Sequence, residues 1–102
     1  MIVISVCYPK TTSSTFNYDY YLQTHTPLLK TRLTGLGLEK VELLRNIATL
    51  DGSTPTFELI ALLTFTSIEH MQSAMAAHGA EIVDDIPNFT NVQPIIQINQ
   101  PL

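Results

Sequence analysis

Apolar residues recur at every second position in two segments of the chain, and a period of two residues is typical of a β-strand. Residues 2–8 show this pattern, and residues 56–65 show it more strongly, with Phe57 and Leu59 followed by further apolar residues on the same face. Two other extended segments are shorter or less regular. Strands are therefore expected over residues 2–8, 38–48, 56–65 and 94–99.

Two further segments show the longer period of an amphipathic helix, in which apolar residues return every three or four positions. Asn17 can cap the first helix, which is expected to run in some form to Leu33 before two glycines end it. Ser67 can cap the second helix, and Pro87 is expected to stop it. The predicted order of elements is therefore β-α-β-β-α-β.

This order predicts an α+β, ferredoxin-like fold, in which an antiparallel four-stranded sheet carries both helices on one face. At this length one domain covering residues 1–102 is expected. The first and third strands are apolar on both faces, whereas a sheet with one wet face should alternate apolar and polar residues. Only 14% of the residues are charged, so the second face also needs cover. We therefore expect a homodimer that packs sheet against sheet.

Charge and cysteine content narrow the classes of partner. The formal net charge is -4, and the five Lys and Arg residues are scattered singly, which argues against a nucleic-acid partner. No apolar run approaches the roughly 18 residues that a membrane-spanning helix needs. The first residues lack the basic region and cleavage site of a signal peptide. With Cys7 as the only cysteine, a reducing, cytoplasmic location is expected.

The first helix carries a histidine on its apolar side. At 100° per residue, Tyr18, Leu22, His25 and Leu29 fall on one stripe, with Tyr21 beside it. His25 should therefore face the sheet. It could be a buried neutral imidazole bonded to a tyrosine or to a backbone carbonyl. The alternative is an acid–base group, because imidazole exchanges protons near neutral pH.

Pro27 follows this histidine and should disturb the helix. It has no N–H and clashes with the carbonyl group of residue 23, so a break or kink is expected. It should also move Thr26 away from helical dihedral angles, so that Thr26 caps a new helical piece. A kink beside an inward-facing histidine could open a pocket between the helix and the sheet.

The second helix contains the remaining candidate groups. His78 and Glu81 stand three residues apart and could supply two metal ligands, but two are too few, and no metal site is predicted. Asp84 and Asp85 end the helix, where negative charge opposes the helix dipole, which hints that one of them has a partner. The chain has no phosphate-binding loop and none of the common hydrolase or zinc motifs.

Three segments together resemble the EthD family of the dimeric α+β barrel superfamily: IVISVCYP, YDYYLQTHTPLLKTRL and HGAEIVDDIPNFTNVQPIIQI. The resemblance implies a ferredoxin-like protomer that pairs sheet to sheet into a barrel with a pocket in each protomer. It carries the family's histidine onto His25. It also places Tyr21, His78, Asp85 and Asn88 near the pocket.

The resemblance leaves the reaction open. The founding member is associated with degradation of a fuel ether, and relatives in fungal aromatic polyketide pathways look like dehydratases or decarboxylases. One hypothesis is a cofactor-independent lyase, dehydratase, isomerase or monooxygenase acting on a small, largely apolar or aromatic compound, with His25 as the acid–base group and Tyr21 orienting it or binding substrate oxygen. A second is a non-catalytic protein that holds such a compound for a partner enzyme. A third is haem binding through His25 or His78. Fold alone does not choose among them.

Overall fold

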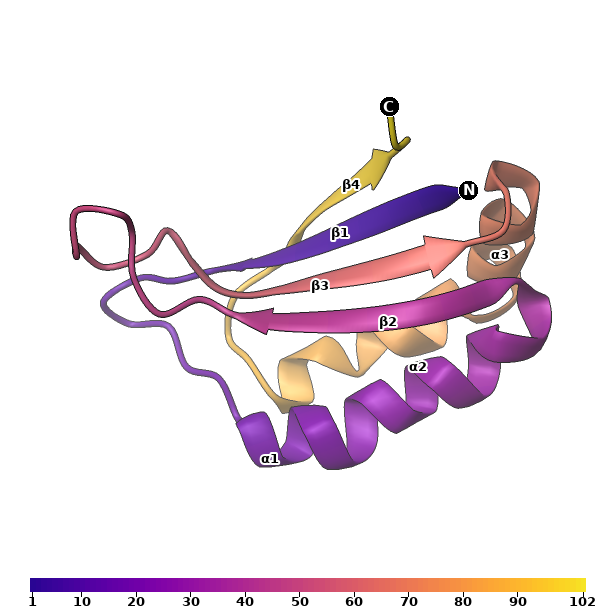
Figure 1. The fold of residues 1–102 in the computed structure, drawn as a ribbon. Helices are drawn as coiled ribbons and strands as arrows, with labels where there is room; N and C mark the ends of the chain where they lie inside the picture. The colour runs from indigo at the N-terminus through magenta and orange to yellow at the C-terminus, as the bar shows by residue number, and fades with distance from the viewer.

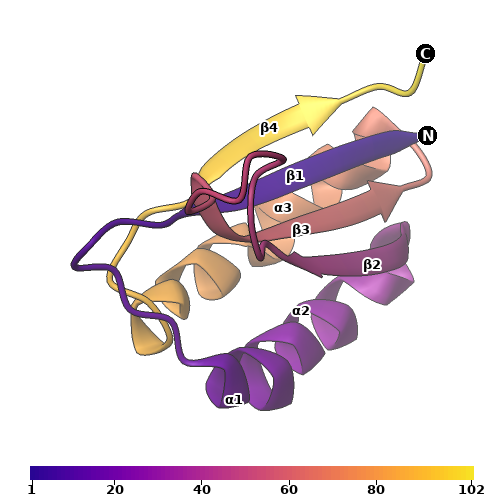
Figure 2. The same ribbon diagram turned by 60° about the vertical axis from the view of Figure 1, so that its left-hand side comes forward.

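The computed structural model describes residues 1–102, in which one antiparallel sheet lies against a layer of helices (Figure 1). The strands are β1 (Ile2–Pro9), β2 (Leu38–Arg45), β3 (Phe57–Phe65) and β4 (Ile95–Asn99). They are arranged in the order β2-β3-β1-β4, so that β2 and β4 form the two edges (Figure 2). The predicted α+β, ferredoxin-like architecture is confirmed.

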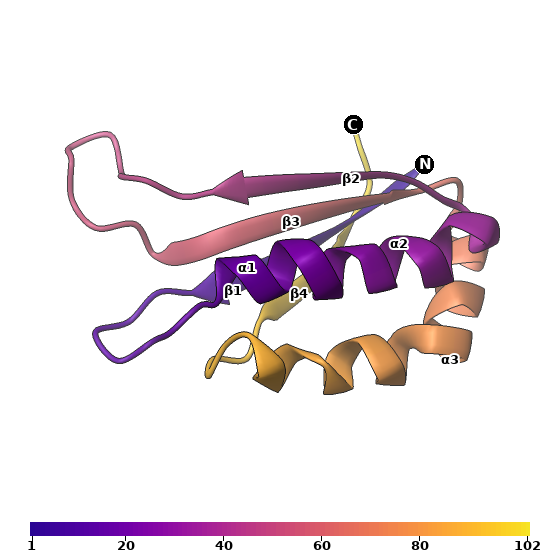
Figure 3. The ribbon, with the colours of Figure 1, turned by 90° about the horizontal axis from the view of Figure 1, so that it is seen from below.

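Both helical regions lie on the same side of the sheet, next to each other (Figure 3). The first consists of α1 (Tyr18–Tyr20), a π-helix (Tyr21–His25) and α2 (Thr26–Leu33), and a short 3-10 helix (Thr34–Leu36) follows it. The second is α3 (Ile68–Asp84), followed by a 3-10 helix (Ile86–Asn88). None of these helices combines the length and the apolar character that crossing a membrane requires.

The helix ends follow the signals in the sequence. The side chain of Asn17 accepts a hydrogen bond from the backbone N–H of Tyr20 at 3.1 Å, and Ser67 accepts one from His70 at 3.2 Å. Both are N-caps, as predicted. Gly37 has a φ of 101°, and a Cβ there would lie 2.7 Å from the Cβ of His70. This position therefore requires glycine for its backbone and for its close approach to α3.

Pro27 alters the first helix without breaking it. In a regular α-helix the carbonyl of Gln23 would accept a hydrogen bond from residue 27, but proline has no N–H to donate. The hydrogen bonds shift by one residue, and the N–H of Thr26 bonds to the carbonyl of Tyr21. Thr26 keeps helical angles of φ -63° and ψ -44°, so the expectation that it would leave the helix and cap a new one was wrong. The disturbance appears as a π-helix, an uncommon element often found at functional sites.

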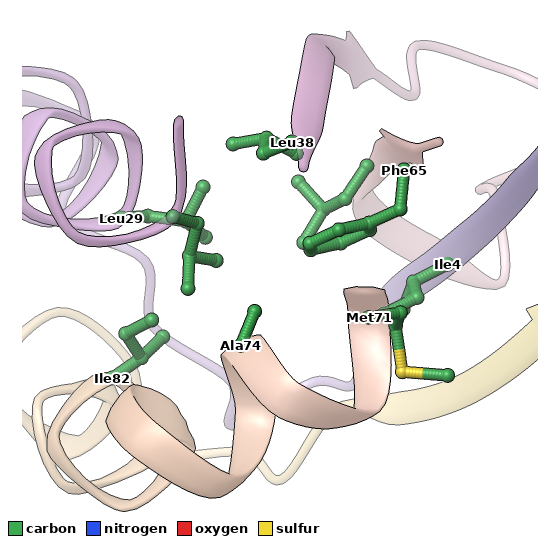
Figure 4. Packing of buried hydrophobic residues seen from close by; sticks show 9 residues of the cluster. Ile4, Leu29, Leu38, Phe65, Met71, Ala74 and Ile82 are labelled. Carbon is green, nitrogen blue, oxygen red and sulfur yellow. The ribbon is translucent and has the colours of Figure 1, made fainter. Parts of the chain in front are cut away.

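The core between the layers consists of two clusters. The leucine-rich cluster lies around the end of β3 and the start of α3 (Figure 4). Its members are Ile4, Leu29, Leu33, Leu38, Leu63, Phe65, Met71, Ala74 and Ile82. The aromatic cluster lies around the π-helix and the end of β1, and its members are Tyr8, Tyr21, Leu59, Ala61, Ile86 and Phe89.

The opposite face of the sheet carries no helix (Figures 1 and 3). Cys7 pairs with Ile60 on one side and Ile95 on the other, and Ile60 pairs with Leu44. These residues form an apolar row across all four strands, in which Leu44 and Ile95 are about half exposed. We call this face the open face.

Candidate functional site

A cavity of about 170 Å³ lies between the inner face of the sheet and the helices. Sixteen of its nineteen lining residues are hydrophobic, and the exceptions are His25, Thr26 and Gly79. An engineered protein cavity of about 150 Å³ is known to hold benzene. The space beside His25 therefore suits a molecule of about one ring.

The cavity reaches the surface between α3 and the edge strand β4. Val83 of α3 and Ile96 and Ile98 of β4 line the cavity, yet about half of each residue is exposed to solvent. Gly79 also lines it from α3, where a Cβ would meet only the side chain of Met75, at 3.6 Å. An apolar rim of this kind gives a small hydrophobic molecule a path to the interior.

The π-helix holds His25 against this cavity. Tyr21, His25, Leu29 and Leu33 are all buried, at intervals of four residues. The imidazole stacks on the ring of Tyr21, with centroids 5.5 Å apart and an interplanar angle of 20°, and lies 4.6 Å from the ring of Phe89. The inward position predicted for His25 is confirmed, because the residue is only 3% exposed.

The same π-helix explains an error in the predicted stripe. Leu22 was expected on the buried side but is 52% exposed. The prediction assumed 100° per residue throughout, whereas the π-helix turns through a smaller angle per residue. The residues before Pro27 are therefore rotated relative to that stripe, and Tyr21 takes the inward position instead of Leu22.

Asp85 fixes the orientation and tautomer of His25. Its Oδ2 lies 2.9 Å from Nδ1 of the imidazole. A carboxylate only accepts hydrogen bonds, so Nδ1 carries the proton of the neutral ring. Nε2 makes no hydrogen bond within the chain, and it is then the basic nitrogen of a ring that borders the cavity.

The other carboxylate oxygen of Asp85 is also held. Oδ1 accepts hydrogen bonds from the Tyr20 hydroxyl at 2.6 Å and from Nδ2 of Asn88 at 3.0 Å. Burial alone would raise the pKa of Asp85, but hydrogen bonds from Tyr20, Asn88 and His25 outweigh it, and the pKa is lowered. Asp85 is therefore an anion at neutral pH. The hydrogen bond with Asp85 is the main cause that raises the pKa of Tyr20, and burial is the second.

The structure brings together four of the five residues named as site candidates. Tyr21 and His25 line the cavity, whereas Asp85 and Asn88 lie behind the imidazole and outside the cavity wall. His78 is half-buried on α3 and belongs neither to the wall nor to the Asp85 network.

His78 and Glu81, the two potential metal ligands on the second helix, do not form part of a larger set. Glu81 accepts a hydrogen bond from Nε of Arg32 at 2.8 Å, and no group of three or more potential ligands from His, Cys, Asp and Glu gathers anywhere in the chain. One of the two acidic residues at the end of the second helix was expected to have a partner. Asp85 has one in His25, whereas Asp84 is exposed.

The sequence did not point to Tyr20 as a partner of Asp85 or to Phe89 as a neighbour of His25. The hydroxyl of Tyr20 reaches a carboxylate 65 residues further along the chain, and no local spacing signals such a contact. Phe89 belongs to the family-like closing segment, in which an aromatic residue is a feature of the resemblance. Its contact with the imidazole could therefore have been suspected from that segment.

Comparisons with known proteins agree on the family. The family model of the EthD domain matches residues 9–93. An EthD-like protein from Ralstonia eutropha JMP134 is 34% identical with a TM-score of 0.88, and the match covers 97% of this chain and 89% of that one. An ethyl tert-butyl ether (EthD) family protein from Bacillus halodurans C-125 is 20% identical with a TM-score of 0.78, covering 100% of this chain and 99% of that one.

A dimeric ferredoxin-like protein from an uncultured marine organism shares the fold. It is 14% identical with a TM-score of 0.57, and the match covers 100% of this chain and 93% of that one. No curated protein matches this sequence. With a family model spanning most of the sequence and a 34% identical relative covering nearly all of it, the chain belongs to the EthD family.

Proposed function

We propose that this protein binds a small, largely apolar organic compound of about one ring in the cavity, and that Nε2 of His25 exchanges a proton with it. One observation carries the proposal. Asp85 holds Nδ1 of His25 at 2.9 Å, while the rest of the imidazole borders a cavity lined almost entirely by apolar side chains. A free basic nitrogen beside such a space suits general acid–base chemistry.

The surroundings of His25 would support both of its protonation states. In the neutral ring, Nε2 has the lone pair that accepts a proton. When Nε2 takes a proton, Nδ1 still donates to the carboxylate of Asp85, so this contact holds the ring in place throughout the transfer. The rings of Tyr21 and Phe89 restrict its rotation. Such proton transfers underlie isomerisation and dehydration, and they require no cofactor.

The test replaces the histidine with a residue of similar size that does not titrate. His25→Gln is compared with the wild-type chain on a panel of single-ring phenols, lactones and ketones. His70→Gln is the matched control, because His70 is exposed and lies outside the cavity wall. The rate should fall by about 10²- to 10⁴-fold in His25→Gln and stay unchanged in the control. A substrate that His25→Gln converts at the full rate would remove the catalytic role.

A second candidate is a carrier that holds such a compound for a partner enzyme. The mostly apolar wall favours it, since Tyr8, Tyr21, His25 and Thr26 are the only lining residues whose side chains carry an oxygen or a nitrogen atom. Native mass spectrometry of the freshly purified protein should then show a retained small molecule that leaves unchanged. Conversion of any compound on the panel, abolished in His25→Gln, would decide against the carrier.

Haem is the weakest of the three alternatives for this cavity. Nε2 of His25 has the chemistry of an axial ligand. However, a cavity of about 170 Å³ suits one ring, whereas a porphyrin joins four pyrrole rings and their side groups. Haem would need α3 and the sheet to separate. A Soret band that forms on titration with haem and disappears in His25→Gln would reverse this judgement.

We also propose that two copies pair through the open face. The support is the apolar row of Cys7, Ile60, Leu44 and Ile95, which no helix covers, and the low content of charged residues. One structural neighbour is described as dimeric. Sedimentation at micromolar concentration should give about twice the chain mass of 11.4 kDa, and Ile60→Lys should shift it toward the monomer. A wild-type chain that sediments as a monomer would contradict the pairing.

A further inference from the structure

The chain has four tyrosines, and they fall into two kinds. The hydroxyl of Tyr18 donates to Glu58 and that of Tyr20 donates to Asp85. Tyr8 and Tyr21 are more deeply buried, at 2% and 3% exposed, yet neither hydroxyl forms a hydrogen bond within the chain. The two most buried phenols are thus the two without partners.

This arrangement is unusual, because buried tyrosine hydroxyls normally find a partner. Every side-chain nitrogen or oxygen atom that is fully buried in this chain has a hydrogen-bond partner. The hydroxyl oxygens of Tyr8 and Tyr21 have none, so neither oxygen is completely enclosed by protein atoms. The open space that both side chains border is the cavity beside His25. Burial raises the pKa of both phenols, so they remain protonated and can donate hydrogen bonds.

The two rings are close to each other and to the histidine. The centroids of Tyr8 and Tyr21 are 6.0 Å apart with an interplanar angle of 81°, and Tyr21 stacks on His25 at 5.5 Å. All three side chains line a space of about one ring in volume. The wall of this space therefore includes two phenols without partners and one histidine.

We propose that the hydroxyls of Tyr8 and Tyr21 form an oxygen-binding subsite, and that the ligand is a single-ring compound bearing a carbonyl oxygen. The inference rests on the proposed function, because it assumes that the cavity is the binding site. A carbonyl oxygen only accepts hydrogen bonds, and it can accept two of them, which matches two phenol donors. The carbon skeleton of the ring matches the apolar remainder of the wall.

The subsite gives the proton transfer a definite course. Nε2 of His25 removes a proton from a carbon adjacent to the carbonyl, and the C–H electron pair becomes a C=C bond. The π electrons of the carbonyl move onto its oxygen, where the two hydroxyls stabilise the negative charge. Return of the proton from Nε2 to a carbon of the enolate regenerates the neutral imidazole, so no oxidant, reductant or further reactant is consumed.

The test uses two probes of nearly the same shape, cyclohexanone and methylenecyclohexane. The second has a CH₂ group in place of the carbonyl oxygen of the first. Each is titrated into the wild-type protein and into Tyr8→Phe and Tyr21→Phe, with binding followed by amide NMR shifts. Tyr18→Phe is the control, because that hydroxyl bonds to Glu58 and Tyr18 does not line the cavity.

Each cavity-facing substitution should weaken cyclohexanone binding by about 2- to 10-fold, the usual range for one net hydrogen bond. Binding of methylenecyclohexane should stay the same in every variant, and Tyr18→Phe should leave the binding of both probes unchanged. If the Phe variants weaken both probes equally, or neither, the hydroxyls do not bind the ligand oxygen and the subsite is refuted. A water molecule bonded to the hydroxyls would give that second result.

The titrations distinguish the loss of the oxygen contact from the loss of the cavity as a binding site. If both probes bind and the Phe variants make no difference, the cavity stands as a binding site and only the oxygen contact falls. If neither probe binds to the wild-type protein, both proposals fall. Should a variant fold poorly, ¹³C-labelled tyrosine in the wild-type protein replaces it. The Cζ signals of Tyr8 and Tyr21 should then move with cyclohexanone and stay fixed with methylenecyclohexane, and the reverse result overturns the subsite.

Discussion

The two clusters of the core lie between the same sheet and the same helices, yet they are built differently. The leucine-rich cluster contains only apolar side chains (Figure 4). Three of its members, Leu33, Phe65 and Ala74, have no exposed surface. The aromatic cluster includes two phenols without partners and packs against His25. One end of the core therefore supplies close packing, and the other combines rings, polar groups and open space.

Helix geometry accounts for part of this difference. Beside the leucine-rich cluster, α2 and α3 are regular, so their side chains interlock in the ordinary way. Beside the aromatic cluster, the π-helix replaces regular turns, with Tyr21 buried and Leu22 exposed. We infer that stability resides mainly at the first end, which leaves the second free to carry groups that do not maximise packing.

The largest expected effect is on stability, at the leucine-rich end. Leu33→Ala removes a fully buried side chain and should lower the free energy of unfolding by about 2–5 kcal/mol. Leu22→Ala is the matched control in the same helical region, and it should change stability by less than about 0.5 kcal/mol because about half of Leu22 is exposed. Urea unfolding measures both. Equal losses would show that the two residues are not buried differently and would contradict the rotation caused by the π-helix.

The next largest effect is expected at Asp85. Asp85→Asn removes the negative charge that accepts bonds from His25 and Tyr20, and it should lower stability at neutral pH by about 1–3 kcal/mol. Asp84→Asn is the control, because Asp84 is exposed and no hydrogen bond joins its carboxylate to this network.

The effect of Asp85 should depend on pH in a defined direction. Its pKa is lowered in the folded protein, so the anion stabilises the fold above the unfolded pKa of about 3.9. This contribution disappears as the pH falls through the lower folded pKa. Unfolding measured from about pH 6 to about pH 2 should therefore show the wild-type advantage over Asp85→Asn shrinking with acidity. An advantage that grows with acidity would refute the lowered pKa.

A smaller effect of the opposite sign is expected at Gly79. Glycine within a helix is less stable than alanine by about 0.5–1 kcal/mol, and a Cβ here would make an ordinary contact with Met75 at 3.6 Å. Gly79→Ala should therefore raise stability by about that amount while reducing the space available to methylenecyclohexane. Thermal unfolding measures the gain in stability, and titration with methylenecyclohexane measures the loss of space. A variant that gains stability and binds the probe unchanged would show that Gly79 does not shape the cavity.

The smallest effect is expected at Tyr20. Its hydroxyl is one of the three donors that lower the pKa of Asp85, so Tyr20→Phe should raise that pKa while Asn88 and His25 still hold it below the usual value. NMR titration of the ¹³C-labelled Asp85 carboxyl group measures this change. Tyr18→Phe serves as the control, because that hydroxyl donates to Glu58 instead. An unchanged pKa would mean that Tyr20 does not act on this carboxylate.

Most of the fold can be predicted from the sequence because the signals for strands and helix ends are local. Alternation identifies the strands, and the side chains of Asn17 and Ser67 cap the helices where they were expected. The π-helix is not encoded in this way. Pro27 indicates a disturbance, but whether the chain breaks or shifts its hydrogen bonds depends on packing against the sheet, and so the outward position of Leu22 was missed.

The candidate site depends more on contacts across the chain. The periodicity of the first helix places His25 inward, and the resemblance to the EthD family brings Tyr21, Asp85 and Asn88 near it. The bond between His25 and Asp85 joins residues 60 apart in the sequence, and no spacing rule predicts it. Alternation places Tyr8 in the first strand, but only the three-dimensional structure shows that its side chain lines the cavity and that its hydroxyl lacks a partner.

We propose above that His25 presents a free basic nitrogen to a cavity that holds a ring compound. Two-dimensional ¹⁵N NMR of the histidine-labelled protein at about pH 8, where imidazole groups are ordinarily neutral, tests it directly. Nδ1 of His25 should carry a proton and Nε2 should carry none. The Nε2 signal should move with methylenecyclohexane, while the signals of His70 and His78 stay fixed. A proton on Nε2, or an Nε2 signal unchanged at saturating probe, would contradict it.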